Sequence, residues 1–120
     1  MTEKKYDLGD RTFKFSQELL SFCSRVPKSQ ISNPIISQLV RSGTSIGANY
    51  AEADAASTKK DFLNKLAISR KEINETKYWL RLIAEIVQRE EETLIKLSRE
   101  VQELNLIFAA IIRNGKIKND

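Results

Sequence analysis

The chain has 120 residues, 41% of them apolar and 30% charged, a balance typical of a folded domain rather than of a disordered segment. Its net charge of +4 and pI of about 9.3 are compatible with a polyanionic partner without requiring one. It contains no histidine, which excludes the commonest general base and the commonest metal ligand in proteins.

The first predicted helix spans residues 10–26. Asp10 is a favourable N-cap residue, and Pro27 ends the helix because the residue before a proline avoids the helical conformation. One apolar stripe, with steps of three and four residues, runs along this helix: Phe15, Leu19, Phe22, Cys23 and Val26. Phe13 and Leu20 lie off this stripe, so we expect them to meet another surface.

The second predicted helix spans residues 33–56, with Ser32 or Asn33 as its cap. Gly43 and Gly47 lie inside it, and each costs up to about 1 kcal/mol of helix propensity relative to alanine. A sequence tolerates that cost where a neighbouring element must come close. Other small residues extend the same surface: Ser42, Ser45, Ala48, Ala51 and Ala55.

The third predicted helix spans residues 58–88, and Thr58 and Asp61 at its start resemble a capping box. A heptad row alternates steps of four and three residues, as in bundle packing: Phe62, Leu66, Ser69, Ile73, Thr76, Leu80, Ile83 and Val87. A second row runs beside it: Ile68, Glu72, Glu75, Trp79, Leu82 and Ile86. Two rows carry more apolar surface than one core needs, so we expect the chain to self-associate.

The fourth predicted helix spans residues 91–114, with glutamates at its start and Gly115 as its C-terminal cap. Its apolar row comprises Leu94, Leu97, Val101, Leu104, Phe108 and Ile111. The expected apolar face is widened by Ile95, Leu106, Ile107 and Ile112. Four amphipathic helices with short connections predict an all-α, antiparallel up-and-down four-helix bundle that forms a single domain over residues 1–120.

The location of the protein is predicted from three absences in the sequence. No apolar run follows the first charged residues, so no secretory signal is expected. No stretch approaches 18 consecutive apolar residues, so no membrane span is expected. Cys23 is the single cysteine, which fits a reducing compartment. We therefore expect a cytoplasmic protein with no membrane partner.

Three ordered motifs run through the second and third helices. They are Gln38-x-x-Arg41-Ser42-x-x-Ser45-Ile46-x-x-Asn49-x-x-Glu52, Asp61-Phe62-x-x-Lys65, and Lys71-Glu72-x-x-Glu75-Thr76-x-Tyr78-Trp79-Leu80. They resemble the bacterial four helix bundle protein family, whose members include proteins encoded by intervening sequences within 23S rRNA genes. The chain is also similar to the accessory variability determinant of diversity-generating retroelements. The resemblance extends from about Tyr6 to Arg113.

This resemblance implies a four-helix protomer in a ring-shaped homopentamer. For the retroelement relatives it implies a basic barrel that binds a reverse transcriptase and nucleic acid.

Three carboxylates, Glu52, Glu72 and Glu75, suggest two interpretations. A di-metal bundle site also uses carboxylates from several helices, but with histidines that this chain lacks. We favour ion pairs, in which Glu52 and Glu75 bind Arg41 or Lys71 across helices. No catalytic residue, metal site or cofactor site is predicted.

A polar line on the second helix comprises Gln38, Ser42, Ser45 and Asn49. Hydroxyl and amide donors contact nucleic-acid phosphates in many complexes. They also form hydrogen bonds between closely packed helices, and we favour this second interpretation. Tyr78 and Trp79 could likewise stack on bases, although a tryptophan on a bundle helix more often packs in a core or subunit interface.

Two sets of functional residues are predicted. The expected contacts between copies are Ser42, Ser45, Ile46, Trp79 and Leu82. The expected contacts with RNA or DNA are Lys14, Lys59, Lys60, Lys65, Arg70, Lys77 and Arg81. Five copies of a +4 protomer would carry a charge of about +20, a field that attracts nucleic acid in a salt-dependent way.

The sequence therefore predicts a non-enzymatic homo-oligomer, and the family resemblance implies that this oligomer is a pentameric ring. It would act as a scaffold for nucleic acid or for a nucleic-acid-processing protein such as a reverse transcriptase. The alternative is a protein-binding adaptor with no nucleic-acid role, in which a different protein covers the surplus apolar row.

Overall fold

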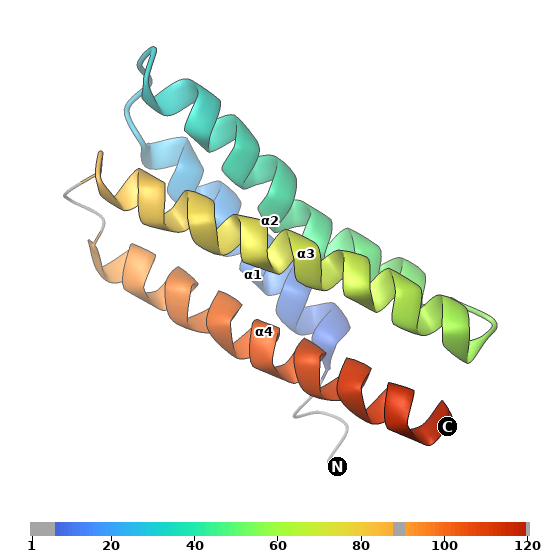
Figure 1. Cartoon of the computed structure of the whole chain (residues 1–120). Coiled ribbons are helices and arrows are strands. Elements are labelled where there is room, and N and C mark those ends of the chain that lie inside the picture. Colours follow the sequence, from blue (N-terminus) through green and yellow to red (C-terminus); the bar gives the residue numbers. More distant parts are fainter. Residues whose placement is uncertain (1–6, 88–90, 120) are drawn as a thin grey trace.

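The computed structural model describes residues 7–87 and 91–119 (Figure 1). Within these ranges the chain forms four helices and no strand: α1 (Leu8–Arg25), α2 (Ser32–Asp54), α3 (Lys59–Ala84) and α4 (Glu91–Asn119). Each helix packs on the next in the chain, and α1 closes more loosely onto α4. Cross-helix pairs confirm the antiparallel order, since Arg41 faces Glu75 while Glu52, further along α2, faces the earlier Lys65. The predicted all-α bundle is confirmed.

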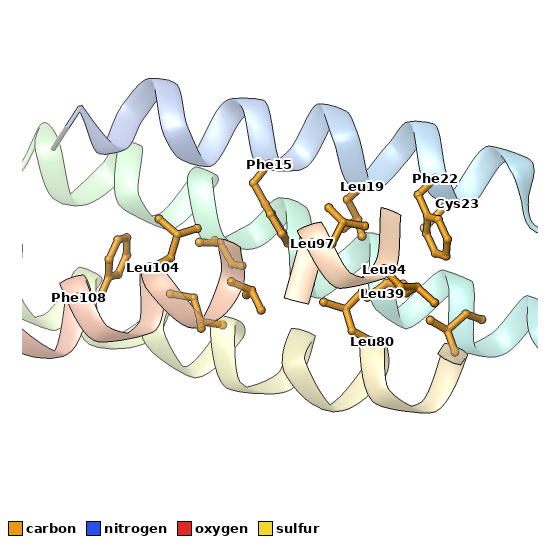
Figure 2. Packing of buried hydrophobic residues seen from close by; sticks show 14 of the residues in the cluster. Phe15, Leu19, Phe22, Cys23, Leu39, Leu80, Leu94, Leu97, Leu104 and Phe108 are labelled. Atoms are coloured by element: carbon orange, nitrogen blue, oxygen red, sulfur yellow. The ribbon is translucent and has the colours of Figure 1, made fainter. Parts of the chain in front are cut away.

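The apolar rows predicted for α1, α3 and α4 form most of the core, together with Leu39 and Ile46 of α2, and Figure 2 shows side chains of this core interdigitating between the ribbons. Phe15, Leu19 and Phe22 of α1 are at most 1% exposed. The heptad row of α3 is buried from Leu66 to Val87, as predicted. Burial of a large apolar side chain contributes about 1.5–3 kcal/mol, so these rows supply most of the driving force for folding.

The start of α1 differs from the prediction. The helix begins at Leu8, and the Asp7 carboxylate accepts a hydrogen bond of 3.2 Å from the Asp10 backbone N–H. Asp7 is therefore the cap, and the predicted cap at Asp10 is wrong. The physical reason is Leu8, whose side chain is 2% exposed and places the first turn on the core.

Other helix ends agree in part. Thr58 caps α3 as predicted, because its hydroxyl accepts from the Asp61 N–H at 3.1 Å. The helix ends at Ala84 rather than at residue 88, which lies outside the described residues. After Ala84 the backbone tightens, and the N–H groups of Glu85 and Ile86 donate to carbonyls three residues back. Helix α2 begins at Ser32 and ends at Asp54, within two residues of the predicted bounds.

The glycines of α2 and α4 mark close contacts between helices. A Cβ atom at Gly43 would lie 2.0 Å from Leu19 Cδ2, and one at Gly47 would lie 3.0 Å from Thr12 Oγ1. The expected close approach at α2 is thus provided by α1. Gly115 is not a C-terminal cap, because α4 continues to Asn119. A Cβ there would lie 2.8 Å from Leu63 Cδ2, so Gly115 serves packing against α3.

Two residues predicted to widen the apolar face of α4 are on the surface instead. Ile95 is 50% exposed and Leu106 is 59% exposed. The core rows already fill the space between the helices, so these side chains point outward. Phe13 and Leu20 of α1 are also exposed, and a contact of these side chains with another surface stays a prediction. The protomer therefore leaves large apolar side chains uncovered on several faces.

Candidate nucleic-acid interface

Three of the predicted basic residues share one side of α3. Arg70, Lys77 and Arg81 are separated by seven and four residues, a spacing that places them on one helical face. Arg70 Nε donates to Asn105 Oδ1 at 3.2 Å, and Lys77 Nζ donates to Gln102 Oε1 at 2.6 Å. Both acceptors are neutral amides of α4, so these contacts orient the cations without neutralising them.

Exposed residues extend this surface along α3. We call the resulting set the basic stripe: Lys60, Arg70, Lys71, Lys77 and Arg81. At 1.5 Å per residue, the distance from Lys60 to Arg81 is about 32 Å. Tyr78, 55% exposed, lies within the stripe beside Lys77. A row of cations with an exposed aromatic ring can bind the backbone and one base of a single-stranded nucleic acid.

The first turn of α3 carries Lys59 and Lys60, both exposed. Cations at a helix N-terminus oppose the helix dipole, whereas Asp61 in the same turn complements it. The two lysines therefore add positive charge at a position where they do not help the helix form. They extend the basic surface towards the corner between α2 and α3.

The structure separates two other predicted residues from the stripe. Lys14 lies on α1 and lines a hollow between α1 and α4 together with Glu18 and Lys96. Lys65 binds Glu52 of α2 at 2.9 Å, and this hydrogen bond raises the pKa of the lysine. Neither residue belongs to a continuous basic surface with Arg70.

Lys71 belongs to the stripe but is absent from the set predicted as nucleic-acid contacts. Sequence reasoning assigned it to an ion pair with Glu52 or Glu75. The signal that could have found it is the spacing from Lys71 to Tyr78 and Arg81, which places all three on the outer side of α3.

The carboxylates of α3 form the predicted ion pairs in part. Arg41 of α2 binds Glu75 directly and Glu72 at 3.3 Å. The Trp79 indole N–H donates to the same Glu75 carboxylate at 3.0 Å. The Trp79 hydrogen bond and then Arg41 lower the pKa of Glu75. The predicted Arg41–Glu75 pair is confirmed.

The prediction that Glu52 pairs with Arg41 or Lys71 is wrong. Glu52 lies eleven residues after Arg41 on α2, about 16 Å along the helix axis, where the antiparallel register places Lys65 opposite it. Within residues 7–87 and 91–119, acidic and sulfur side chains form no group of three that could hold a metal ion.

One residue of the polar line of α2 forms a hydrogen bond inside the bundle. Ser42 is fully buried, and its oxygen accepts a hydrogen bond of 2.9 Å from the Thr76 hydroxyl of α3. The favoured interhelical interpretation is confirmed there. Ser45 and Asn49 instead donate to backbone carbonyls within α2, at 2.6 and 2.9 Å. Gln38 accepts from Arg41 at 3.0 Å on the same helix.

The predicted contacts between copies need correction at two positions. Ser42 and Ile46 are 0% and 1% exposed within the isolated protomer, so no second copy can reach them. Both residues belong to the packing contact between α2 and α3, where Ser42 accepts from Thr76 and the Ile46 carbonyl accepts from Ser69. Ser45, Trp79 and Leu82 are half-buried and reach the surface. They remain predicted contacts.

The comparisons with known proteins fit this architecture. The model of the 23S rRNA-intervening sequence protein family matches residues 4–110. The chain belongs to this family. A crystal structure of a protein of unknown function from the S23 ribosomal protein family of Bacteroides thetaiotaomicron is similar, with 36% identity and a TM-score of 0.77. The match covers 87% of this chain and 96% of that one. No curated protein matches the chain significantly.

Family membership confirms the resemblance to proteins encoded by intervening sequences within 23S rRNA genes. The similarity to the accessory variability determinant of diversity-generating retroelements stays a prediction. Family membership shows which proteins the chain is related to. The related crystal structure is itself of a protein of unknown function. No helix in the described part of the chain has the length and hydropathy that a membrane span requires.

Proposed function

We propose that this protein is a non-enzymatic scaffold that assembles into a homo-oligomeric ring, most simply a pentamer, and associates with RNA or DNA through the basic stripe of α3. The observation that carries the proposal is the segregation of charge on α3. Its cations Arg70, Lys77 and Arg81 contact neutral amides or solvent. Its glutamates Glu72 and Glu75 lie on the other side and bind Arg41.

Assembly strengthens the electrostatic argument. One protomer has a net charge of +4, which attracts a polyanion weakly. A ring repeats the stripe once per copy, so a single strand of nucleic acid can contact several stripes at once. Linked contacts of this kind raise the overall affinity without any new interaction. A nucleic-acid-processing enzyme such as a reverse transcriptase would then meet its substrate on the scaffold.

The proposal is tested by binding of a fluorescent single-stranded RNA, measured by anisotropy between about 50 and 200 mM salt. We expect wild-type protein to bind at about 50 mM and to lose affinity steeply as salt rises. The variant Arg70→Gln/Lys77→Gln/Arg81→Gln should bind at least about 10-fold more weakly. Its slope of log K against log salt should fall by about 0.7 for each phosphate contact removed.

The matched control removes three charges elsewhere, in Lys14→Gln/Lys28→Gln/Lys96→Gln. All three lysines are exposed and lie away from the stripe. This control should lose little affinity. Equal losses in the two triple variants would show that net charge, and not the stripe, attracts the nucleic acid. Absence of binding by the wild type at about 50 mM would reject the nucleic-acid role.

A second candidate function is a protein-binding adaptor, which the exposed apolar side chains favour. In that case the purified chain is a monomer, and another protein covers those side chains. Light scattering separates the two functions, because the scaffold has a mass several times the 13.7 kDa of one chain.

A further inference from the structure

A charged hollow of about 440 Å³ lies between α1 and α4, and no residue of the basic stripe lines it. Its volume is in the range of small-molecule sites. The ring of Phe15, which is 1% exposed, forms its floor. The remaining lining side chains are all charged: Arg11, Lys14 and Glu18 of α1, and Lys96, Arg99, Glu100 and Glu103 of α4. A small ligand in this hollow would therefore meet charges rather than apolar surface.

Arg11 and its acidic partners close one end of the hollow. The Arg11 guanidinium binds Glu100 at 2.7 Å and Glu103 at 2.8 Å. The hydrogen bond with Glu100 raises the pKa of Arg11. Because both carboxylates already have a cation beside them, they repel an added anion less than free carboxylates would. These three residues are therefore a wall of the hollow and not its binding groups.

Glu18 and Lys96 mark the other end of the hollow. Both also line a smaller hollow of about 190 Å³ that follows along the same two helices, next to Ser21 and Thr93. Within residues 7–87 and 91–119, no ion pair joins Glu18 to a cation. Its carboxylate and the Lys96 ammonium therefore offset each other only at longer range, and this end is close to neutral.

Cations from both helices lie between these two ends. Lys14 belongs to α1, while Arg99 belongs to α4, one turn from Lys96. Arg99 also lines a hollow between α3 and α4, so its side chain runs along the outer side of α4. In the described part of the chain none of the three cations binds a carboxylate. Their mutual repulsion would be relieved by a bound anion, and the apolar floor at Phe15 strengthens that attraction.

We propose that this hollow binds a small ligand with a diphosphate group, held between Lys14 of α1 and the pair Lys96 and Arg99 of α4. Two linked phosphate centres have acceptor oxygens for cations of both helices at once. Arginine binds phosphate through two parallel N–H groups, and lysine binds it as a point charge. The Phe15 ring is too buried to stack on a base, so the phosphates alone are recognised. The site uses side chains of one protomer and depends on neither the proposed assembly nor the basic stripe.

The test is isothermal titration calorimetry with inorganic pyrophosphate, in metal-free buffer at constant ionic strength. Wild-type protein should bind one pyrophosphate per chain. The variant Lys14→Gln/Lys96→Gln/Arg99→Gln should bind at least about 10-fold more weakly, because it loses the charge-assisted hydrogen bonds to the phosphate oxygens. All three side chains are exposed, so the variant should keep its helix content by circular dichroism. Absence of pyrophosphate binding by the wild type would overturn the proposed site.

The matched control is the stripe variant Arg70→Gln/Lys77→Gln/Arg81→Gln, which removes the same number of charges from α3. It should bind pyrophosphate as tightly as the wild type does. Equal losses in the two triple variants would show that net charge attracts the anion, and a loss in the stripe variant alone would place the anion on α3. Either result overturns the site in the hollow. RNA binding is measured separately, so its success or failure does not decide this one.

A ligand series distinguishes free diphosphate from the diphosphate of a nucleotide. Pyrophosphate and ADP should bind with similar affinity, whereas adenosine should not bind, because the hollow offers no aromatic face to a base. Sulfate should bind more weakly than pyrophosphate, since a single anionic centre cannot reach the cations of both helices. Binding of adenosine, or of sulfate as tightly as pyrophosphate, would contradict a diphosphate site.

A second measurement does not depend on substitutions. In a nuclear magnetic resonance titration of the wild type with pyrophosphate, backbone amide signals of residues 11–18 and 96–103 should shift together, because both helices contribute to the site. Shifts confined to α3 would place the anion on the basic stripe and overturn the site between α1 and α4.

Discussion

Helices α2 and α4 occupy diagonal corners of the bundle and hold their neighbours by different means. Around α2 the buried contacts are short and made by small residues, with Gly43 against Leu19 on one side and Ser42 against Thr76 on the other. The ion pairs that Arg41 and Glu52 of α2 make with α3 lie outside these buried contacts. Between α4 and α1 the surface contact is made by long charged side chains. Arg11 reaches Glu100 at 2.7 Å and Glu103 at 2.8 Å. The position of α2 is therefore fixed by close buried contacts, whereas α4 is held against α1 by partly exposed ion pairs.

This difference indicates which contacts determine the register between neighbouring helices. A buried hydroxyl has a hydrogen-bond partner in only one alignment of two helices, and a shift leaves it unsatisfied at a cost of about 1–3 kcal/mol. Ser69 shows the same arrangement, because its hydroxyl donates to the Ile46 carbonyl at 2.7 Å. In the described part of the chain every buried side-chain nitrogen or oxygen has a hydrogen-bond partner. Exposed ion pairs tolerate shifts, because long side chains follow their partners and water replaces lost contacts.

The largest effect is expected at Gly43. The Gly43→Ala substitution places a Cβ atom 2.0 Å from Leu19 Cδ2, and Leu19 is fully buried and cannot move into open space. Overpacking should destabilise the protein by about 2–3 kcal/mol, more than the gain in helix propensity restores. Urea unfolding measures the change. The matched control is Gly9→Ala, where the nearest atom is Asp7 Oδ1 at 3.7 Å. Equal stability of the two variants would show that α2 does not approach α1 so closely.

A smaller effect is expected at the hydroxyl pair between α2 and α3. Thr76→Val keeps the shape of the side chain but removes the donor to Ser42, leaving that buried oxygen with a weak contact at 3.5 Å to the Leu39 carbonyl. The cost should be about 1.5 kcal/mol. The double variant Thr76→Val/Ser42→Ala should lose less than the sum of the two single variants, because no buried partner is then left unsatisfied. Simple additivity in denaturant unfolding would contradict a coupled pair.

The predictable part of the fold is the part that depends on periodicity. The core rows of α1 and α3 follow from steps of three and four residues, because these steps leave one face of a helix apolar. The details that the sequence did not predict are positions where two residues have similar propensities for the same role, such as capping a helix. Asp7 and Asp10 are both good caps, and Leu8 decides between them by its burial. Glycine is the residue that most often caps a helix C-terminus, but at Gly115 a glycine is required because a Cβ atom would collide with the Leu63 side chain.

The candidate site was less predictable, because the role of each of its residues depends on which side chain lies opposite it on the neighbouring helix. Lys65 and Lys71 are chemically alike in the sequence, but Glu52 lies opposite only Lys65. Ser42 and Ser45 are likewise both polar residues of α2, and only the antiparallel register shows that Thr76 buries the first.

The smallest effect is expected where α4 meets α1. Arg11→Met removes the guanidinium that binds Glu100 and Glu103 but keeps most of the apolar stem of the side chain. The Arg11 and Glu100 side chains are 26% and 30% exposed, and Glu103 is 63% exposed. Exposed pairs contribute about 0.2–1 kcal/mol, and salt screens them. We therefore expect a loss below about 1 kcal/mol that shrinks further in 1 M salt, measured by urea unfolding at both ionic strengths. A loss as large as that at Gly43, and independent of salt, would show that α4 is held as tightly as α2 and would remove the contrast between the two corners.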